Sequence, residues 1–561
     1  MNSGTMLNAY PDSMGGRLGE AVKLLARPEM KGVFRSFYIL PSMFNTDLDR
    51  GFSIISYDVS RELADEKDLA ALRALGIDLK LDFVLNHLSV LSPQFQDIVK
   101  NGEKSKYTDF FINWNAFWKD HGEMTEGGYI MPEDSSMEKM FFRKPGLPLL
   151  MVRMPDGRDV PYWNTFYQEI TYPRIDAQDL MDAMEIQFLT AERLAERINA
   201  ALSGGKTPKE IDFSGFEEYR EAACDYLESR RRYLGQMDVN LRSPLVWDFY
   251  AQTLRRLAEY GAAIVRLDAF AYAPKEPGTR CFLNEPDTWD VLARISGMAQ
   301  PHGLELLPEI HASYAEGRYA QLAELGYMVY DFFLPGLLID AIEHRDAAYL
   351  IRWANELREK KIRAVNMLGC HDGIPLLDLK GLLPDERIEE MISLIVSRGG
   401  LIKDLHGKKN MYYQVNATYY SALGEDDRKM LAARAMQLFM PGKPQIWYLD
   451  LFAGKNDYEA VKRSGAAGHK EINRTNLTEA QIEEALGRPV VRDQLALLRM
   501  RNACAAFGFD ADFVIEQKEG NRLCMAWEKG GARASLEIGL ETLAFVIEAD
   551  MPDGVFCYEQ E

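Results

Sequence analysis

The stretch AIVRLDAFAY (263–272) decides the fold of this chain. Its first half is an apolar run as long as a buried β-strand, and the run ends at the acid Asp268. Seven other short apolar runs occur along the chain, at 6–10, 37–40, 79–85, 304–307, 327–330, 364–367 and 445–449. Helical patterns separate most of them, for example at 289–298 and 428–439. Eight strands alternating with helices predict an α/β fold, namely a (β/α)8 TIM barrel.

The length predicts additions to the barrel. A TIM barrel takes about 250 residues, whereas this chain has 561. Beyond residue 501 the hydrophobic period changes to two, which is typical of antiparallel strands. We predict three domains: a barrel at 1–87 and 237–500, an inserted domain after the third strand at 88–236, and a C-terminal β domain at 501–561. The barrel carries a shorter insertion after its seventh strand at 373–424, and the inserted domain carries a helical extension at 167–235.

Composition excludes several classes of partner. Asp and Glu outnumber Lys and Arg by 85 to 65, and a net charge of −20 argues against nucleic acid, which needs a basic face. The six cysteines form no C-x-x-C pair, which favours free thiols in a reducing compartment. No signal peptide is visible, and no apolar run reaches the roughly 18 residues of a membrane span. We therefore expect a cytoplasmic protein without a membrane segment.

Acids follow three of the predicted strands. Asp268 ends the fourth strand, Glu309 follows the fifth and Asp372 follows the seventh. Because the C-terminal ends of barrel strands face the active site, we expect these carboxylates to meet there. Arg266 shares a strand face with Asp268 and should lower the pKa of that carboxyl, as suits a nucleophile. Partial desolvation should raise the pKa of Glu309, as suits a proton donor.

Such paired carboxylates are typical of glycosidic chemistry, and a separation of roughly 5–5.5 Å would mean retention through a covalent glycosyl-enzyme. Four motifs resemble the signature regions of the α-amylase superfamily, and more closely its sucrose phosphorylase branch: LDFVLNH (81–87), IVRLDAFAY (264–272), LPEIH (307–311) and CHDGI (370–374). Four flanking segments agree: KYTDFFI (106–112), PGTRCF (277–282), YQVNATYYSAL (413–423) and EINR (471–474).

The resemblance implies a role for each matching position. Asp268 would be the nucleophile, Glu309 the general acid/base, and Asp372 a transition-state stabiliser that holds sugar hydroxyls. Arg266 would keep Asp268 charged. The other substrate-binding residues that it implies are Asp49, Phe52, His87, Phe166, Gln236, Tyr272, His311, His371, Gln414 and Arg474. Among these, Asp49 with Arg474 resembles the pair at the closed end of the glucose pocket, and the two phenylalanines resemble its aromatic walls.

Two basic segments stand where the family binds phosphate or the acceptor. Arg143 and Lys144 lie in the first, whereas Lys408 and Lys409 precede Tyr413 in the second. Arg143 and Lys144 resemble the doubly basic pair of the sucrose 6′-phosphate branch. The chain departs from the sucrose-specific pattern at two positions: Lys144 replaces an arginine, and Met411 replaces an aspartate that contacts fructose. It also departs from the pattern of the sucrose 6′-phosphate branch, because Tyr413 stands where that branch has a histidine. The leaving group therefore stays open among fructose, fructose 6-phosphate, glycerol and glycerate.

We expect a retaining α-glucosyl disaccharide phosphorylase, a hexosyltransferase that cleaves sucrose or a sucrose-like α-glucoside with inorganic phosphate to give α-glucose 1-phosphate. No cofactor or metal is implied: Asn86 stands where calcium-binding amylases place a ligand, but the branch does without calcium. A glucosylglycerol- or glucosylglycerate-type phosphorylase and a sucrose hydrolase or transglucosidase are alternatives. A catalytically dead binding barrel is disfavoured because all three acids are present. The extension at 167–235 could be a lid, a homodimer surface or a peripheral decoration.

Overall fold

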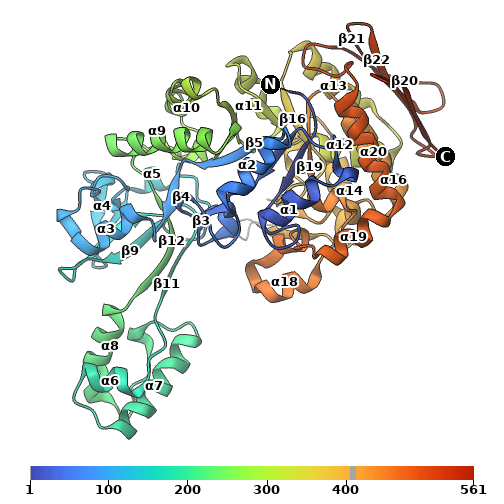
Figure 1. The fold of residues 1–561 in the computed structure, drawn as a ribbon. Helices are drawn as coiled ribbons and strands as arrows, with labels where there is room; N and C mark the ends of the chain where they lie inside the picture. The colour runs from blue at the N-terminus through green and yellow to red at the C-terminus, as the bar shows by residue number, and fades with distance from the viewer. Residues whose placement is uncertain (1, 405–411) are drawn as a thin grey trace.

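The chain folds around a nearly closed barrel of parallel strands (Figure 1). The structure is a computed structural model that describes residues 2–404 and 412–561. The two outer strands of the sheet order, β14 and β15, contact one another, so the barrel is nearly closed. In hydrogen-bonded order the strands are β14 (Glu305–Pro308), β13 (Ala262–Asp268), β5 (Asp78–Val84), β2 (Ser36–Ile39), β1 (Met6–Ala9), β19 (Lys443–Trp447), β16 (Ala364–Met367) and β15 (Val329–Asp331). Each overlaps one of the eight predicted runs, and the TIM barrel is confirmed.

Helices cover the outside of the barrel and connect its strands (Figure 1). Their starts follow from local chemistry: the Asp65 carboxylate caps α2, and the Asp426 carboxylate accepts the Arg428 and Lys429 amides at the start of α16. The helices that connect or follow barrel strands include α1 (Leu18–Leu25), α2 (Glu66–Ala74), α9 (Pro244–Glu259), α10 (Asp287–Ala299), α11 (Arg318–Glu324), α12 (Leu334–His344), α13 (Ala348–Glu359), α14 (Asp385–Ser397), α16 (Asp427–Phe439), α19 (Glu479–Gly487) and α20 (Pro489–Ala503).

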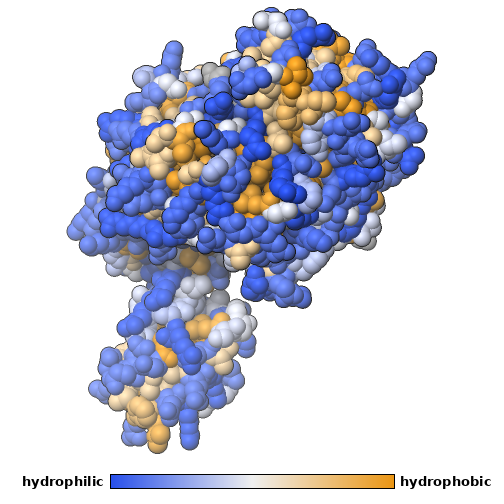
Figure 2. Space-filling model, turned by 45° about the vertical axis from the view of Figure 1, so that its right-hand side comes forward, coloured by the Kyte–Doolittle hydropathy of each residue, from blue (hydrophilic) through white to orange (hydrophobic). Residues whose placement is uncertain are grey.

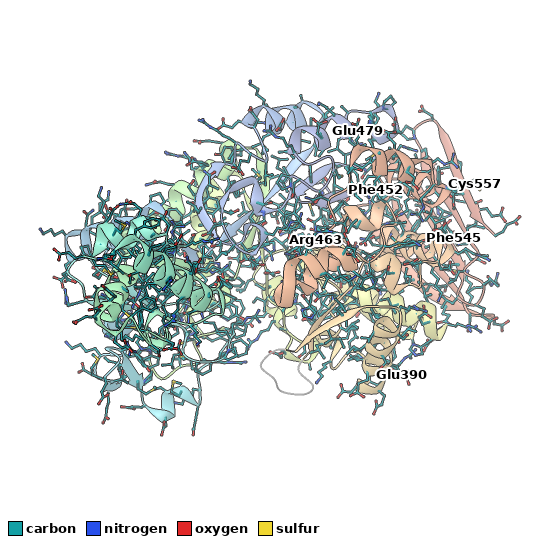
Figure 3. All side chains as sticks on the ribbon, turned by 90° about the horizontal axis from the view of Figure 1, so that it is seen from below. Glu390, Phe452, Arg463, Glu479, Phe545 and Cys557 are labelled. Atoms are coloured by element: carbon teal, nitrogen blue, oxygen red, sulfur yellow. The ribbon has the colours of Figure 1, made fainter. Side chains whose placement is uncertain are left out.

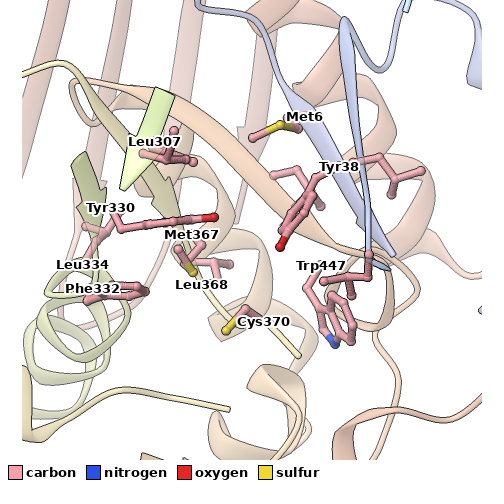
Figure 4. Packing of buried hydrophobic residues seen from close by; sticks show 14 of the residues in the cluster. Met6, Tyr38, Leu307, Tyr330, Phe332, Leu334, Met367, Leu368, Cys370 and Trp447 are labelled. Carbon is pink, nitrogen blue, oxygen red and sulfur yellow. The ribbon is translucent and has the colours of Figure 1, made fainter. Parts of the chain in front are cut away.

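The barrel interior is filled with side chains, as in other TIM barrels. Figure 4 shows Tyr38 and Tyr330 pointing toward one another from β2 and β15, with Leu307 and Met367 around them. Tyr38 is 1% exposed, and Leu307 and Met367 are also buried. The interior is therefore a packed core, and a reaction can take place only at an end of the barrel.

The segment after β5 leaves the barrel and returns at α9. Its first part carries short elements that lie against the barrel (Figure 1). They are β6 (His87–Ser89), α3 (Pro93–Asn101), α4 (Trp114–Phe117), β7 (Gly122–Met124), β8 (Ile130–Pro132), α5 (Asp134–Met137), β9 (Leu149–Arg153) and β10 (Asp159–Trp163). β6 pairs with β12 (Arg232–Asp238), so the far end of the insertion is fastened beside His87.

The second part of the insertion forms a helical lobe. It contains α6 (Ala177–Ala183), α7 (Phe188–Ser203) and α8 (Arg220–Ser229), and the strand pair of β11 (Gln168–Thr171) and β12 joins it to the rest. Figures 1 and 2 show the lobe projecting from the main body on a narrow neck. Its buried residues, among them Leu180 and Leu194, form a hydrophobic cluster separate from the barrel core. Phe188 and Leu189 at the start of α7 remain 54% and 67% exposed.

The C-terminal segment is an antiparallel sheet of five strands: β20 (Asp512–Lys518), β21 (Arg522–Lys529), β22 (Ala532–Gly539), β23 (Phe545–Met551) and β24 (Gly554–Gln560). Gly530 and Gly531 form the two-residue turn between β21 and β22 with φ of 57° and 83°, values that favour glycine. Alternate residues of β22 are buried, and the Trp527 Nε1–H of β21 donates to the Phe439 carbonyl of α16 at 2.8 Å. Figure 3 shows Phe545 and Cys557 on this sheet, far from the helical lobe.

The second insertion of the barrel follows β16 and holds α14 together with β17 (Leu401–Asp404), β18 (Tyr412–Asn416) and α15 (Tyr419–Ala422). Among the described residues, no helix is both long and apolar enough to span a bilayer. The domain boundaries given above stay a prediction.

Candidate active site

The three acids come together at the C-terminal end of the barrel. The Arg266 guanidinium joins two of them: its Nη1 lies 2.9 Å from Asp268 Oδ1 and its Nη2 lies 2.5 Å from Glu309 Oε1. Carboxylate oxygens of Glu309 and Asp372 lie within 4.8 Å of each other and of a His311 ring nitrogen. The acid side chains are 14–15% exposed, so a ligand can reach them. This spacing suits contact with one sugar ring.

Arg266 also contacts a buried carboxylate deeper in the barrel. Its Nη1 also lies 2.6 Å from Asp82 Oδ1, and the Tyr38 hydroxyl donates to the two Asp82 oxygens at 3.0 and 2.9 Å. Arg266, Asp82 and Tyr38 are all at most 2% exposed. One buried guanidinium therefore serves three carboxylates, and its charge is shared among them.

The two acids that Arg266 joins have pKa shifts of opposite direction. Burial raises the pKa of Asp268 well above its ordinary value, and the neighbouring carboxylates add to the rise, while Arg266 only partly opposes it. Burial also acts to raise the pKa of Glu309, but Arg266 and His311 outweigh it and lower this pKa to about 2. Asp268 and Glu309 share Arg266, so the two carboxyls titrate together, and which of them holds a proton stays a prediction.

Asp372 is surrounded by cations and a histidine. Lys470 Nζ lies 2.5 Å from Asp372 Oδ1, Arg474 Nη2 lies 3.9 Å from the same oxygen, and His371 Nε2 lies 3.2 Å from Oδ2. Burial acts to raise the pKa of Asp372, but these three neighbours hold it well below its ordinary value. Sequence reasoning missed Lys470, and its position directly before the EINR motif was the available signal.

His311 extends the site beyond Glu309. Its Nε2 lies 3.6 Å from Glu309 Oε1 and its Nδ1 lies 3.5 Å from Asp378 Oδ2, while its ring stacks on Phe332. Burial acts to lower the pKa of His311, but the two carboxylates outweigh it and raise this pKa to about 9. His311 is therefore an imidazolium at neutral pH, and it stabilises the ionised form of Glu309.

Aromatic rings line the site, as expected for a glucose-binding surface. Phe52 stacks on the His371 ring with centroids 5.1 Å apart. The Phe52 carbonyl accepts from His87 Nε2 at 2.9 Å and from Gln236 Nε2 at 3.3 Å. Phe166 lies 5.1 Å from the His87 ring by centroid. The structure thus places five predicted residues in one wall.

Tyr272 and Gln414 add to this surface. The Phe166 ring packs edge-on against Tyr272, with centroids 5.1 Å apart. Gln414 is 6% exposed, and its Nε2 has no hydrogen-bond partner among the described residues. Asn416, two residues further along β18, donates to the Asp372 carbonyl at 2.8 Å. The strand carrying Gln414 therefore reaches the acids.

The predicted pair of Asp49 and Arg474 is not joined by an ion pair in the part of the chain that the structure describes, and Asp49 is exposed. Arg50 is the residue that contacts Arg474, because its Nη1 donates to the Arg474 carbonyl at 2.7 Å. Asp49 and Arg50 both have left-handed backbone, with φ of 49° and 51°. Gly51 follows with φ of 118°, where an added Cβ would lie 2.2 Å from Ser42 N. A tight turn thus positions Asp49 at the edge of the site.

The predicted acceptor residues are only partly described. The Arg143 guanidinium lies over the Phe166 and Tyr272 rings, 5.7 and 5.9 Å from their centroids. Lys144 instead donates to Asn164 Oδ1 at 2.7 Å, and burial lowers the pKa of its ammonium to about 8. Lys408, Lys409 and Met411, together with the side chain of Tyr413, lie outside the described residues.

An ammonium group occupies the position next to Asn86. Lys275 Nζ donates to Asn86 Oδ1 at 2.8 Å and to the Tyr272 carbonyl at 2.5 Å, and it lies 2.7 Å from Asp238 Oδ2. Asp238 also accepts from the Thr165 amide at 2.9 Å. Lys275 thus supplies a positive charge where β5, β12 and β13 end. Sequence reasoning gave no sign of it.

Two sets of side chains among the described residues have the spacing of a metal site: Cys370, His371 and Asp372, and Glu309, His311 and Asp372. Both lie within the acid cluster. Their carboxylates already have cationic partners in Arg266, Lys470 and the His311 imidazolium, and a divalent cation would have to compete with these. The donor set therefore fits a charged sugar-binding site better than a metal centre.

Comparison with solved structures shows which proteins share this fold. A barrel with acids at its C-terminal end and a terminal antiparallel sheet is the architecture of the α-amylase superfamily. An α-amylase from H. orenii shares the fold with a TM-score of 0.59 at 12% identity, covering 96% of this chain and 89% of that one. No protein-family model matches the chain.

Two relatives and one crystal structure narrow the class. A protein of Ilumatobacter coccineus named sucrose 6(F)-phosphate phosphorylase is 49% identical over 97% of this chain and 95% of its own length. A protein of the same name from Thermoanaerobacterium thermosaccharolyticum is 33% identical over 97% of this chain and 96% of its own. The crystal structure of sucrose 6F-phosphate phosphorylase from Thermoanaerobacter thermosaccharolyticum matches with a TM-score of 0.81 at 32% identity, covering 100% of this chain and 98% of that one.

The chain belongs to the sucrose phosphorylase branch of the α-amylase superfamily. This membership confirms the resemblance seen in the four motifs. It also confirms the expectation of a phosphorylase that transfers a hexosyl group.

Proposed function

We propose that this chain catalyses the reversible phosphorolysis of sucrose 6F-phosphate, giving α-glucose 1-phosphate and fructose 6-phosphate with retention of configuration. The observation that carries the proposal is the meeting of Asp268, Glu309 and Asp372 around one sugar-sized site. The two relatives named sucrose 6(F)-phosphate phosphorylase support the choice of substrate.

The first step forms a covalent intermediate. Asp268 attacks the anomeric carbon of the glucosyl unit while Glu309 protonates the glycosidic oxygen, and fructose 6-phosphate leaves. This step needs an ionised Asp268 and a protonated Glu309. Because Arg266 contacts both carboxyls, a proton can be redistributed between them when the substrate binds.

The second step reverses the chemistry with a new acceptor. Phosphate attacks the β-glucosyl-Asp268 ester, the Glu309 carboxylate takes the proton of the incoming phosphate, and α-glucose 1-phosphate leaves. Two inversions at the same carbon give net retention. A phosphate dianion is repelled by the acids, so the site must offer it cations or hydrogen-bond donors.

The glucosyl unit is held by the polar groups around Asp372. Asp372 accepts from sugar hydroxyls, and His371 hydrogen-bonds the same ring. His87 joins them by exchanging its bond to the Phe52 carbonyl for one to the sugar. The unpartnered Nδ1 of His371 is free for this purpose among the described residues. Lys470 keeps Asp372 ionised and exchanges its contact with that carboxylate for a sugar hydroxyl when the substrate binds.

We assign the phosphate of the fructose moiety to Arg143 and Lys144. Both are half-buried, and the Arg143 guanidinium lies over the Phe166 and Tyr272 rings. A half-buried guanidinium forms charge-assisted, bidentate bonds to phosphate, and the second cation doubles the attraction. Sucrose lacks this phosphate and gains nothing from either residue.

A panel assay tests the proposal. The enzyme is incubated with phosphate and, in separate reactions, sucrose 6F-phosphate, sucrose, glucosylglycerol or glucosylglycerate, and glucose 1-phosphate is measured. The proposal predicts the highest kcat/KM with sucrose 6F-phosphate. Glucose release that is independent of phosphate would show a hydrolase instead, and a preference for another donor would reassign the leaving group.

The proposal also covers the cellular compartment, the domain organisation and the oligomeric state. We place the reaction in a reducing cytoplasm, which the six free cysteines support. The division into a barrel, an inserted domain with a helical lobe and a terminal β domain is our domain proposal. A homodimer stays a prediction, which sedimentation analysis at several protein concentrations would check.

A further inference from the structure

Lys80 is a buried lysine in the centre of the barrel, below the acids. It lies on β5 two residues before Asp82, so the two side chains share the inner face of the strand. Lys80 is 0% exposed. A lysine at such a position costs free energy unless other groups compensate for its burial, so a role in function is worth seeking.

The partners of Lys80 come from other strands of the barrel. Its Nζ donates to the Tyr330 hydroxyl of β15 at 2.5 Å and to Gln445 Oε1 of β19 at 2.7 Å. The same ammonium lies over the ring of Tyr38 on β2, 3.9 Å from its centroid. The closeness of the two tyrosines across the interior is visible in Figure 4. No carboxylate is an ion-pair partner of Lys80 within the described part of the chain.

A continuous chain of contacts leads from Lys80 to the reacting groups. A cation over a phenol ring makes its hydroxyl a stronger donor, and the Tyr38 hydroxyl donates to both oxygens of Asp82. The more fully Tyr38 satisfies Asp82, the less Asp82 draws on the guanidinium of Arg266. The remaining charge of Arg266 is then available to the two acids beyond it.

We propose that Lys80 is a positioning residue for the glucosyl transfer: through Tyr38 and Asp82 it fixes how Arg266 is divided between Asp82 and the two reacting acids. This inference rests on the proposed function, because it takes Asp268 as the nucleophile and Glu309 as the acid. Lys80 itself touches no substrate.

The groups around Lys80 determine in which direction its loss shifts the pKa of the acids. The titratable groups that face it are Tyr38, Asp82, Arg266, Glu309, Tyr330 and Cys370. Burial lowers the pKa of Lys80 well below its ordinary value, and Arg266 adds to this, whereas the two carboxylates oppose it. Loss of the lysine removes a positive charge and weakens the Tyr38 hydrogen bond. Both changes make ionisation of the acids harder.

The test is the pH profile of a Lys80→Met variant, which keeps the side-chain length and removes the charge. The probe is α-glucosyl fluoride, whose departing fluoride needs no proton from Glu309, so that the initial burst of fluoride reads attack by Asp268 alone. In a plot of burst rate against pH, we expect the rise on the acid side, called the acid limb below, to move to higher pH by about one unit. The burst rate below that limb should fall about tenfold, with little change in KM.

Two further variants separate positioning from simple packing. Tyr38→Phe breaks the link to Asp82 while leaving Lys80 in place, and should shift the limb in the same direction. The double variant should show one shift and not the sum of two, because both changes break the same chain. Tyr38→Phe also keeps the test decisive if Lys80→Met does not fold.

Lys443→Met is the matched control. Lys443 is a second buried lysine of the barrel, but it donates to the Asn2 and Gly4 carbonyls at the N-terminal end of β19, away from the acids. The Lys443→Met variant should be less stable than wild type, but the pH profile of its burst rate should not shift. An unchanged profile in Lys80→Met or in Tyr38→Phe, or an equal shift in Lys443→Met, would overturn the proposal. A wild-type enzyme that shows the fluoride burst but makes no glucose 1-phosphate would instead refute the proposed function.

Discussion

Replacing Lys275 by Met should strongly destabilise the chain and disorder one wall of the active site. Lys275 and Asp238 form an ion pair at 2.7 Å in which both side chains are at most 2% exposed. Removing the ammonium leaves the Asp238 charge buried, and breaking such a pair costs about 3–5 kcal/mol of unfolding free energy. Asn86 Oδ1 would also lose its donor. Because Asp238 pairs with His87 across β12 and β6, kcat/KM should fall as well.

Urea unfolding followed by tryptophan fluorescence measures the loss. Lys119→Met, an exposed lysine of the same insertion, is the matched control and should change stability by less than about 0.5 kcal/mol. Adding Asp238→Asn to Lys275→Met removes the unpaired charge and should recover at least about 1 kcal/mol. If Lys275→Met costs no more than the control, or if the second substitution recovers nothing, the buried pair does not fasten the insertion to the barrel.

Three further results are expected. Asp268→Asn should retain less than about a percent of wild-type turnover, and a higher residual rate would rule Asp268 out as the nucleophile. Asp378 and Glu309 raise the pKa of His311 from 6.5 to about 9. Protonated His311 therefore stabilises the folded chain fully below pH 6.5, and this stabilisation is lost as the pH rises through 9. The unfolding free energies of wild type and His311→Gln should therefore differ by about 3 kcal/mol at pH 6 and converge above pH 9, whereas a constant difference would contradict this. Arg143→Ala should raise KM for sucrose 6F-phosphate by about tenfold to a hundredfold and leave sucrose unchanged, with Arg158→Ala as the exposed control; equal losses on both sugars would refute a phosphate contact.

The barrel could be predicted from the sequence because each strand is a short apolar run, and parallel strands are buried on both faces. The placement of the acids followed from topology alone, since Asp268, Glu309 and Asp372 each come at or just after a strand end. Neither inference needed a distance. Both depend on a repeated pattern that many residues share.

What the sequence missed depends on single contacts. Lys80, Lys275 and Lys470 are lone lysines in unremarkable surroundings, and nothing in the sequence pairs them with residues up to hundreds of positions away. The direction of each acid's pKa shift could not be predicted either, because it depends on burial and on how closely charged neighbours approach each carboxyl. Differences of a few tenths of an ångström leave no trace in residue spacing.

The most direct test of the double displacement is the configuration of the sugar phosphate first formed from sucrose 6F-phosphate and inorganic phosphate. Phosphorus and proton magnetic resonance, recorded as the reaction runs, distinguish the two anomers. Two successive displacements at Asp268 predict α-glucose 1-phosphate with release of one fructose 6-phosphate per turnover. The β anomer, or free glucose in place of a sugar phosphate, would contradict the account.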